Sequence, residues 1–162
     1  MSTPLGRLVG STIYAYQRVA KLTRTGRWPL TIGVRIIVRE GTDQVLLVRH
    51  TYTPGWHFPG GAIDRRETAP DAAARELREE ALIEATAAPR LIGIYLSTQQ
   101  LKSDHIVLFE AGEWRRIEGK SRPLEIAEAR FFPLADLPKG TTGGTRRRVA
   151  ELLGTAERSP YW

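Results

Sequence analysis

The stretch from residue 61 to residue 83, GAIDRRETAPDAAARELREEALI, constrains the fold of this chain more than any other. It places Glu76, Glu79 and Glu80 at positions i, i+3 and i+4, so that three carboxylates share one face of a helix. Three like charges repel one another unless a cation lies among them, and hard cations such as Mg²⁺ take carboxylate oxygens as ligands. The spacing therefore indicates a helix whose acidic face binds a divalent ion.

The same stretch carries the signals that begin a helix. Thr68 and Asp71 have the spacing of an N-terminal capping box, and Pro70 is tolerated in a first turn. An apolar stripe beside the acidic one consists of Ala73, Ala74, Leu77 and Ala81. A solvated amphipathic helix with pairs such as Arg75–Glu79 is the alternative interpretation. The glycine-rich loop before the helix favours the metal site instead.

The complete pattern resembles the Nudix box, the signature of hydrolases that act on a nucleoside diphosphate linked to another group. Eight of its nine fixed positions are matched, by Gly61, Glu67, Arg75, Glu76, Leu77, Glu79, Glu80 and Ile83. The chain is therefore identified as resembling small MutT-like bacterial Nudix proteins of unassigned substrate. The ninth position, a glycine in the family, is Leu82. That glycine ends the helix in a left-handed conformation, where a leucine costs roughly 1 kcal/mol or more. A turn without positive φ is the alternative.

The resemblance implies a divalent metal cofactor, Mg²⁺ or in its place Mn²⁺. Glu76, Glu79 and Glu80 would be its ligands, and Glu79 and Glu80 would also be catalytic. A metal ion is needed because pyrophosphate is strongly anionic and water is a poor nucleophile. The implied reaction is the hydrolysis of a phosphoanhydride bond in a nucleoside diphosphate derivative.

Four further residues in and beside the box have supporting roles in the family. Glu67 and Arg75 would form an ion pair that orients the metal ligands. Gly60 and Gly61 would let the backbone approach the metal and the phosphate closely. We expect all four to lie beside the acidic face of the helix.

The general base that activates water is a box glutamate in some family members and a glutamate from a later loop in others. Glu125 and Glu128 both precede the segment FFPLADLP, where such glutamates occur in the family, and Glu125 is the candidate. The alternatives are that both are surface loop charges or that one of them pairs with Arg130. Glu110 is a further possibility on a predicted strand.

Substrate discrimination must come from residues outside the box. Arg49 ends a predicted strand and would meet a phosphate, unless it is an ordinary surface arginine. Tyr52 and Trp56 would stack on a base or a sugar, with core packing as the alternative for Trp56. The three histidines, His50, His57 and His105, are interpreted as strand residues and not as catalysts.

Composition limits the classes of function. The chain has 162 residues, which suits one domain with a sizeable core. It contains no cysteine, which excludes a disulfide framework, a thiol nucleophile and a zinc–thiolate site. An isopentenyl-diphosphate isomerase, another activity of this fold, is disfavoured for the same reason. No apolar run approaches the length of a transmembrane segment, so we expect a cytoplasmic protein.

The formal net charge of +6 is concentrated at the two ends of the chain. Residues 1–28 contain only basic charges, and Arg146, Arg147 and Arg148 lie close to the other end, where a solvated helix face is the favoured interpretation. A basic protein suggests nucleic acid as a partner. The nearly neutral middle favours a nucleotide-type small molecule. Two alternatives for the function are an RNA 5′-end pyrophosphohydrolase and a catalytically weak nucleotide-binding or regulatory module. Assembly as a homodimer is left open.

Two parts are expected along the chain. Residues 1–28 have apolar residues at helical spacing and form an N-terminal helical extension, and residues 29–162 form the Nudix domain. Strands are predicted at 31–40, 44–50, 56–61, 90–98, 105–111 and 128–134, with a polar loop at 112–124 and a helix from Thr145. This order predicts an α/β fold, an α/β/α sandwich with a mixed sheet, plus an N-terminal amphipathic helix.

Overall fold

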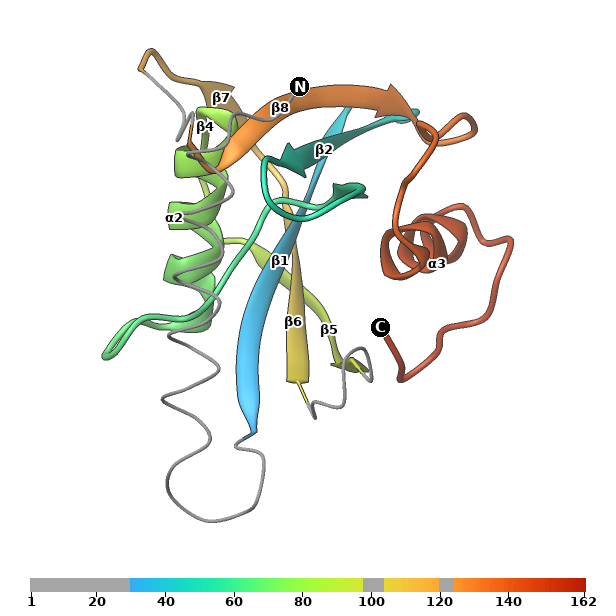
Figure 1. Cartoon of the computed structure of the whole chain (residues 1–162), viewed down its shortest axis with the longest axis horizontal. Helices are drawn as coiled ribbons and strands as arrows, with labels where there is room; N and C mark the ends of the chain where they lie inside the picture. The colour runs from blue at the N-terminus through green and yellow to red at the C-terminus, as the bar shows by residue number, and fades with distance from the viewer. Residues whose placement is uncertain (1–29, 98–103, 120–123) are drawn as a thin grey trace.

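The computed structural model describes residues 30–97, 104–119 and 124–162 (Figure 1). The predicted N-terminal helix lies outside these residues. Eight strands and two helices follow one another in the order β1 Thr31–Glu40, β2 Gln44–His50, β3 Trp56–His57, α2 Ala69–Ala81, β4 Ile83–Ala85, β5 Arg90–Ser97, β6 Asp104–Ala111, β7 Trp114–Arg116, β8 Ile126–Pro133 and α3 Gly143–Leu152. None of the described helices is long and apolar enough to cross a membrane.

The main sheet is mixed. Its strand order is β3-β2-β1-β6-β5, and β8 pairs with β2. Strands β1 and β6 are parallel, in register from Thr31–Asp104 to Val38–Ala111, and the other pairs are antiparallel. A parallel pair needs a long connection between its strands. Here that connection carries the whole 61–83 stretch, which places the stretch beside β1.

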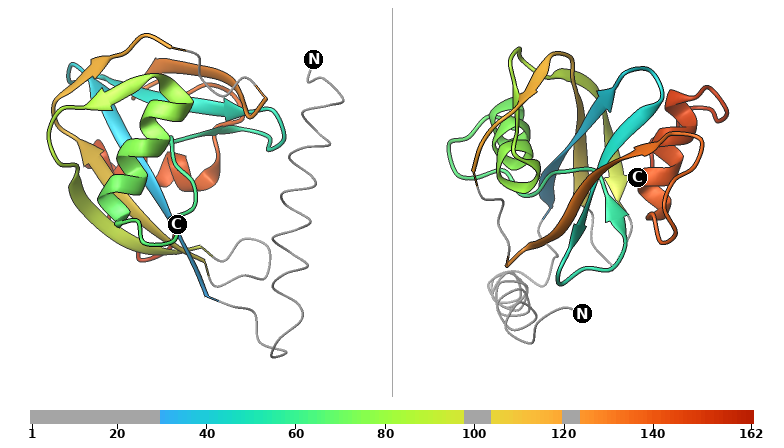
Figure 2. Two further views of the ribbon diagram at one scale, coloured as in Figure 1. Left: turned by 90° about the vertical axis from the view of Figure 1, so that its left-hand side faces the viewer. Right: turned by 90° about the horizontal axis from the view of Figure 1, so that it is seen from above.

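Helices α2 and α3 lie on opposite sides of the strands (Figures 1 and 2). Successive side chains of a strand point to opposite faces, so Val34, Ile36 and Val38 pack towards α2 while Ile37 packs towards α3. Leu77 of α2 belongs to the first core cluster and Val149 of α3 to the second. The predicted α/β/α sandwich with a mixed sheet is confirmed.

The predicted strands agree with the structure except where pairing depends on distant residues. The loop expected at 112–124 contains β7, which pairs with the short strand β4, and the sequence pattern predicted neither. The strand expected at 56–61 is only β3, because Pro59 and Gly61 instead accept hydrogen bonds from the backbone of β1 at 2.9 Å. Helix α3 begins at Gly143, two residues before the predicted start.

The expectation of a solvated face at Arg146–Arg148 is wrong for its last residue. Arg148 is 1% exposed and donates a 2.6 Å hydrogen bond to Glu151. Its guanidinium lies 4.0 Å from the centre of the Tyr95 ring. Burial lowers the pKa of Arg148, and the nearby Glu151 opposes that change. The arginine is therefore a structural element between α3 and the sheet.

Leu82 ends α2 in the left-handed conformation, with φ 55° and ψ 42°. Its N–H donates to Arg78 O at 3.1 Å, and its carbonyl accepts a hydrogen bond from Ile117 N at 2.9 Å. These bonds hold the turn from α2 into β4 in the shape that glycine normally adopts. The leucine therefore carries the conformational strain, and the alternative of a reshaped turn is not what the structure contains.

We predict that Leu82→Gly is more stable than Leu82→Ala by about 1 kcal/mol in free energy of unfolding. Both substitutions remove the side chain, but only alanine keeps a Cβ in the left-handed region. Urea unfolding of the two variants measures the difference directly. Equal midpoints with equal slopes would show that the turn stores no strain.

Candidate functional site

The site begins at the N-terminus of α2, where Thr68 is the N-cap. Its hydroxyl accepts a hydrogen bond from Asp71 N at 3.3 Å, as the capping spacing predicted, and Pro70 lies in the first turn. The cap fixes where the helix starts. The three glutamates lie on the helix that begins here.

The Gly60–Gly61 loop lies between β1 and the acidic face of α2. A Cβ on Gly60, whose φ is 145°, would lie 2.1 Å from Val34 O. A Cβ on Gly61 would lie 2.5 Å from Glu76 Oε1. The backbone thus touches the strand on one side and a carboxylate on the other, which is the close approach expected of these two glycines.

The three box glutamates differ in their burial. Glu76 is 7% and Glu80 5% exposed, whereas Glu79 is half-buried. Glu80 Oε2 accepts a 2.9 Å hydrogen bond from Gly60 N. Burial raises the pKa of Glu80 to about 8, although the Arg35 charge and the Gly60 hydrogen bond act in the opposite direction. The helix therefore holds an acidic side chain at a position where its negative charge lacks sufficient compensation.

Arg75 connects the loop to the acidic face. Its guanidinium donates to both oxygens of Glu67, at 2.7 and 2.9 Å, and to Glu76 at 2.7 Å and Glu79 at 3.1 Å. These hydrogen bonds, first of all those with Glu67, raise the pKa of Arg75. They lower the pKa of Glu67 to about 2. The ion pair expected between Glu67 and Arg75 is present, and it also holds two of the predicted metal ligands.

The donor chemistry fits a hard divalent ion. Carboxylate oxygens are the preferred ligands of such ions, and Glu76 and Glu80 lie beside the loop that approaches them. Within the described residues, however, no three acidic or histidine side chains are gathered closely enough to form a metal site. Arg75 Nη1 contacts Glu76 and Glu79, while the Gly60 N–H contacts Glu80. The carboxylates would therefore have to shift towards one another to share an ion.

Glu125, just before β8, and Glu128, within it, lie in different environments. Glu125 is half-buried, and after burial its charge is among the causes that raise the pKa of Tyr52 and of Glu80, so its charge lies near the box. Glu128 instead pairs with Arg49 at 3.1 Å and Arg130 at 3.2 Å. Glu110, the third possibility, is buried and pairs with Arg39 at 2.8 Å and with Arg90. Of the three, Glu125 is the one named among the charges that shift the pKa of Glu80.

The residues proposed to bind substrate do not share one face. Arg49 pairs with Glu128 and lies over the Trp56 ring, 5.6 Å from its centre. Trp56 is 8% exposed and contacts Phe132 edge-on at 4.7 Å, which agrees with core packing. Tyr52 is 39% exposed and lies 5.3 Å from the His50 ring. Of the three, only Tyr52 lies towards Glu80.

Two residues near the box were not among the predicted site residues. His50 Nε2 lies 3.7 Å from Glu80 Oε1. Burial lowers the pKa of His50 to about 3, so this contact involves a neutral ring and is not an ion pair. Arg35 donates to Gly60 O at 2.6 Å and to Phe58 O at 3.1 Å. The sequence signal that could have identified Arg35 is an arginine between two apolar residues, Val34 and Ile36, of a predicted strand.

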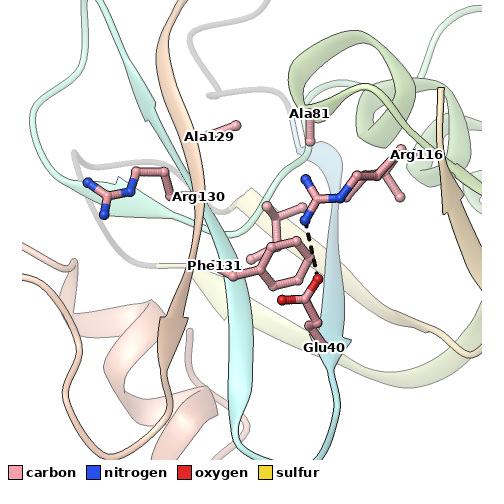
Figure 3. Close-up of a pocket in the computed structure, with 8 residues that line it drawn as sticks. Glu40, Ala81, Arg116, Ala129, Arg130 and Phe131 are labelled. Carbon is pink, nitrogen blue, oxygen red and sulfur yellow. Dashed lines mark hydrogen bonds and ion pairs between the residues drawn. The ribbon is translucent and has the colours of Figure 1, made fainter. Parts of the chain in front are cut away.

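A pocket of about 260 Å³ opens elsewhere, between the end of α2 and β8 (Figure 3). Glu40 and Arg116 form an ion pair at 3.2 Å across it, and Phe131, Arg130 and Ala81 also line it. None of the box glutamates lines this pocket. It is therefore distinct from the site described above.

The fold and the site define an α/β/α protein whose acidic helix lies beside a glycine-rich loop. Sequence comparison identifies its family. The sequence profile of the NUDIX domain family matches residues 29–153. This chain belongs to the NUDIX family.

Two curated relatives match over shorter stretches. A Bacillus subtilis (strain 168) protein named "Putative 8-oxo-dGTP diphosphatase" is 36% identical over 76 residues, which cover 47% of this chain and 50% of that protein. An RNA pyrophosphohydrolase of Pseudomonas aeruginosa (strain LESB58) is 44% identical over 53 residues, a third of each chain. The alignments thus span about half of the first relative and a third of the second.

Solved structures share the fold. A MutT NUDIX hydrolase from Burkholderia pseudomallei superposes with a TM-score of 0.66 at 22% identity, covering 77% of this chain and 98% of that one. A UDP-X diphosphatase superposes with a TM-score of 0.58 at 21% identity, covering 92% and 74%. These similarities establish a MutT-like architecture.

We predict that Glu67 stabilises the fold above about pH 4.5 and that this contribution is lost as the pH falls towards 2. The sign follows because the pKa of Glu67 is about 2 in the folded chain, below its ordinary value of 4.5. Urea unfolding between pH 5 and 3 measures it. Glu67→Gln should flatten the pH dependence, whereas Glu113→Gln, an exposed control, should leave it as in the wild type. The same slope in all three proteins would contradict the prediction.

Proposed function

We propose that the chain is a divalent-metal-dependent pyrophosphohydrolase that cleaves a phosphoanhydride bond in a nucleoside diphosphate derivative. The observation that carries this proposal is the row of Glu76, Glu79 and Glu80 on one face of α2, against the Gly60–Gly61 loop. The names of the curated relatives, a diphosphatase and RNA pyrophosphohydrolases, support the same class of reaction.

The three glutamates are the proposed ligands, and Mg²⁺, or Mn²⁺ in its place, is the proposed ion. When bound, such an ion supplies charge neutralisation for phosphate oxygens and makes water more acidic. The Glu67–Arg75 ion pair orients Glu76 and Glu79 from the side of the loop. Because Glu80 is buried beside Gly60, a cation would favour its ionised form and reverse the effect of burial on its pKa.

In the proposed reaction, water attacks one phosphorus of the diphosphate, and the bond from that phosphorus to the bridging oxygen breaks. The proton of the attacking water passes to a carboxylate. Glu125 is the proposed acceptor because its charge acts on both Glu80 and Tyr52. Glu79 and Glu80 are also proposed as catalytic residues, through their role as ligands of the ion.

We predict hydrolysis of at least one member of a substrate panel with Mg²⁺ or Mn²⁺. The panel contains dNTPs, oxidised dNTPs, ADP-ribose, nucleotide sugars, dinucleoside polyphosphates and 5′-triphosphorylated RNA. Glu80→Gln should lower kcat by about 10²-fold or more, since the amide keeps the shape but not the charge. Glu84→Gln on the neighbouring strand β4 serves as a matched control and should keep wild-type activity.

The outcomes separate the candidate functions. Turnover that Glu80→Gln abolishes supports the hydrolase and names its substrate class. Metal-dependent nucleotide binding without turnover would instead favour the catalytically weak binding or regulatory module, to which the strained Leu82 turn could contribute. If no panel member is either hydrolysed or bound, both proposals are overturned.

The role of Glu125 has its own matched test. We predict that Glu125→Gln lowers kcat by about 10²- to 10⁴-fold, the range for loss of a general base. Glu128→Gln should change kcat by less than about threefold, because that side chain pairs with Arg49 and Arg130. Steady-state kinetics on the best panel substrate compare the two. Similar losses in both variants, or no loss in Glu125→Gln, would assign the base elsewhere.

An RNA 5′-end pyrophosphohydrolase is the second candidate. Its support is the 44% identity to RNA pyrophosphohydrolases and the formal net charge of +6. RNA turnover whose KM rises steeply with salt concentration would favour it, because contacts between basic residues and phosphates release counterions.

The division of the chain at residue 28, the cytoplasmic location and the homodimer stay predictions.

A further inference from the structure

Arg35 is a charged residue in the middle of the central strand β1. Its neighbours Val34 and Ile36 are 1% and 0% exposed and belong to the core on the α2 side. Arg35 itself is half-buried, and its side chain reaches the backbone of the loop that precedes the box. A long cationic side chain in such a position is costly unless it has partners.

The partners of Arg35 are two backbone carbonyls. Nη1 donates to Gly60 O at 2.6 Å and to Phe58 O at 3.1 Å. Among the described residues no carboxylate pairs with this guanidinium, in contrast to Arg39 on the same strand, which pairs with Glu110 at 2.8 Å. The Nε and Nη2 groups carry further N–H donors in a fork that matches phosphate oxygens. One nitrogen is used to hold the loop, and the remaining donors have no partner in the described part of the chain.

The guanidinium is attached to the acidic face through a single residue. Gly60 accepts from Arg35 through its carbonyl and donates to Glu80 Oε2 through its N–H at 2.9 Å. His50 lies beyond Glu80, with its Nε2 at 3.7 Å, and its ring is 5.6 Å from that of His57. Arg35 therefore lies close to the proposed metal ligands without touching them.

The charge of Arg35 acts on groups from three elements. After burial, it is the next largest cause that lowers the pKa of His50 to about 3 and that of His57 to about 4. It also opposes the rise in the pKa of Glu80. A guanidinium stays charged at ordinary pH, so Arg35 offers a positive charge to an anion that binds beside Glu80.

We propose that Arg35 is a substrate-contacting residue whose unused N–H groups donate to the diphosphate oxygens of the substrate. This inference rests on the proposed function, because it concerns the same site. Gly60 would hold the guanidinium in place from one side, so that little side-chain freedom is lost when the anion binds. The diphosphate would then lie between the carboxylate face of α2 and an arginine of β1.

The test uses inorganic pyrophosphate with Mn²⁺ as the probe, measured by isothermal titration calorimetry, and needs no turnover. Arg35→Met should weaken pyrophosphate binding at least about tenfold, in line with the loss of a charge-assisted contact. Arg39→Met, on the same strand and 44% exposed, is the matched control and should change it less than twofold. Mn²⁺ binding alone should stay within about threefold in both variants.

Arg35→Lys keeps the proposal testable if Arg35→Met does not fold. The lysine keeps the charge and one donor but not the fork, so pyrophosphate binding should weaken several-fold while Mn²⁺ binding is kept. With an active substrate, Arg35→Lys should raise KM more than it lowers kcat. A purely structural arginine would not produce that division.

Three results would overturn the inference. They are wild-type protein that does not bind pyrophosphate, a folded Arg35→Met that binds it as tightly as the wild type, and parallel losses of Mn²⁺ and pyrophosphate binding. The proposed hydrolase is judged separately, by turnover on the substrate panel. Pyrophosphate binding that depends on Arg35 without turnover would overturn the hydrolase and keep the anion contact.

Discussion

The site depends on one guanidinium. Arg75 joins the loop, through Glu67 and the Ala62 carbonyl at 3.0 Å, to Glu76 and Glu79 on the helix. Three carboxylates on one helical face would repel one another, and this side chain supplies a positive charge among them. The helix can therefore form in the absence of a metal ion. An arriving cation would have to share Glu76 and Glu79 with Arg75, which then remains as the group that orients them.

Gly60 is the second point on which the site depends, because three separate contacts meet at it. Its Cα lies against β1, its carbonyl holds Arg35, and its N–H holds Glu80. Any side chain at this position would collide with Val34 O. The distance between the cation on β1 and the acid on α2 is consequently set by one residue of backbone, which has little freedom to vary.

The sequence predicted what is local, and it did not predict what depends on distant partners. The α2 cap at Thr68 and the two long strands at 31–40 and 44–50 follow from local sequence patterns, and the Glu67–Arg75 pair from the family resemblance. The β4–β7 pair joins segments about thirty residues apart and left no periodic signal in three-residue strands. This is why the sequence pattern predicts a loop where β7 lies.

The partners of individual side chains also depend on distant parts of the chain, which the sequence pattern does not show. The sequence analysis preferred Glu125 to Glu128 without knowing the partners of either, because only the pairing of β8 with β2 brings Arg49 to Glu128. The sequence predicts that Arg148 is a surface charge, whereas in the structure it contacts Glu151 and Tyr95.

The parallel pairing of β1 with β6 has a consequence for the order of folding. Leu77 of α2 packs against Val34 and Ile36, which precede it in the chain, and against Phe109 and Ala111, which follow about thirty residues later. During synthesis the first partners are present when the helix leaves the ribosome and the second are not. The apolar side of the helix is then only partly covered, a state in which chains aggregate. The core on this side of the sheet is complete only when β6 pairs with β1.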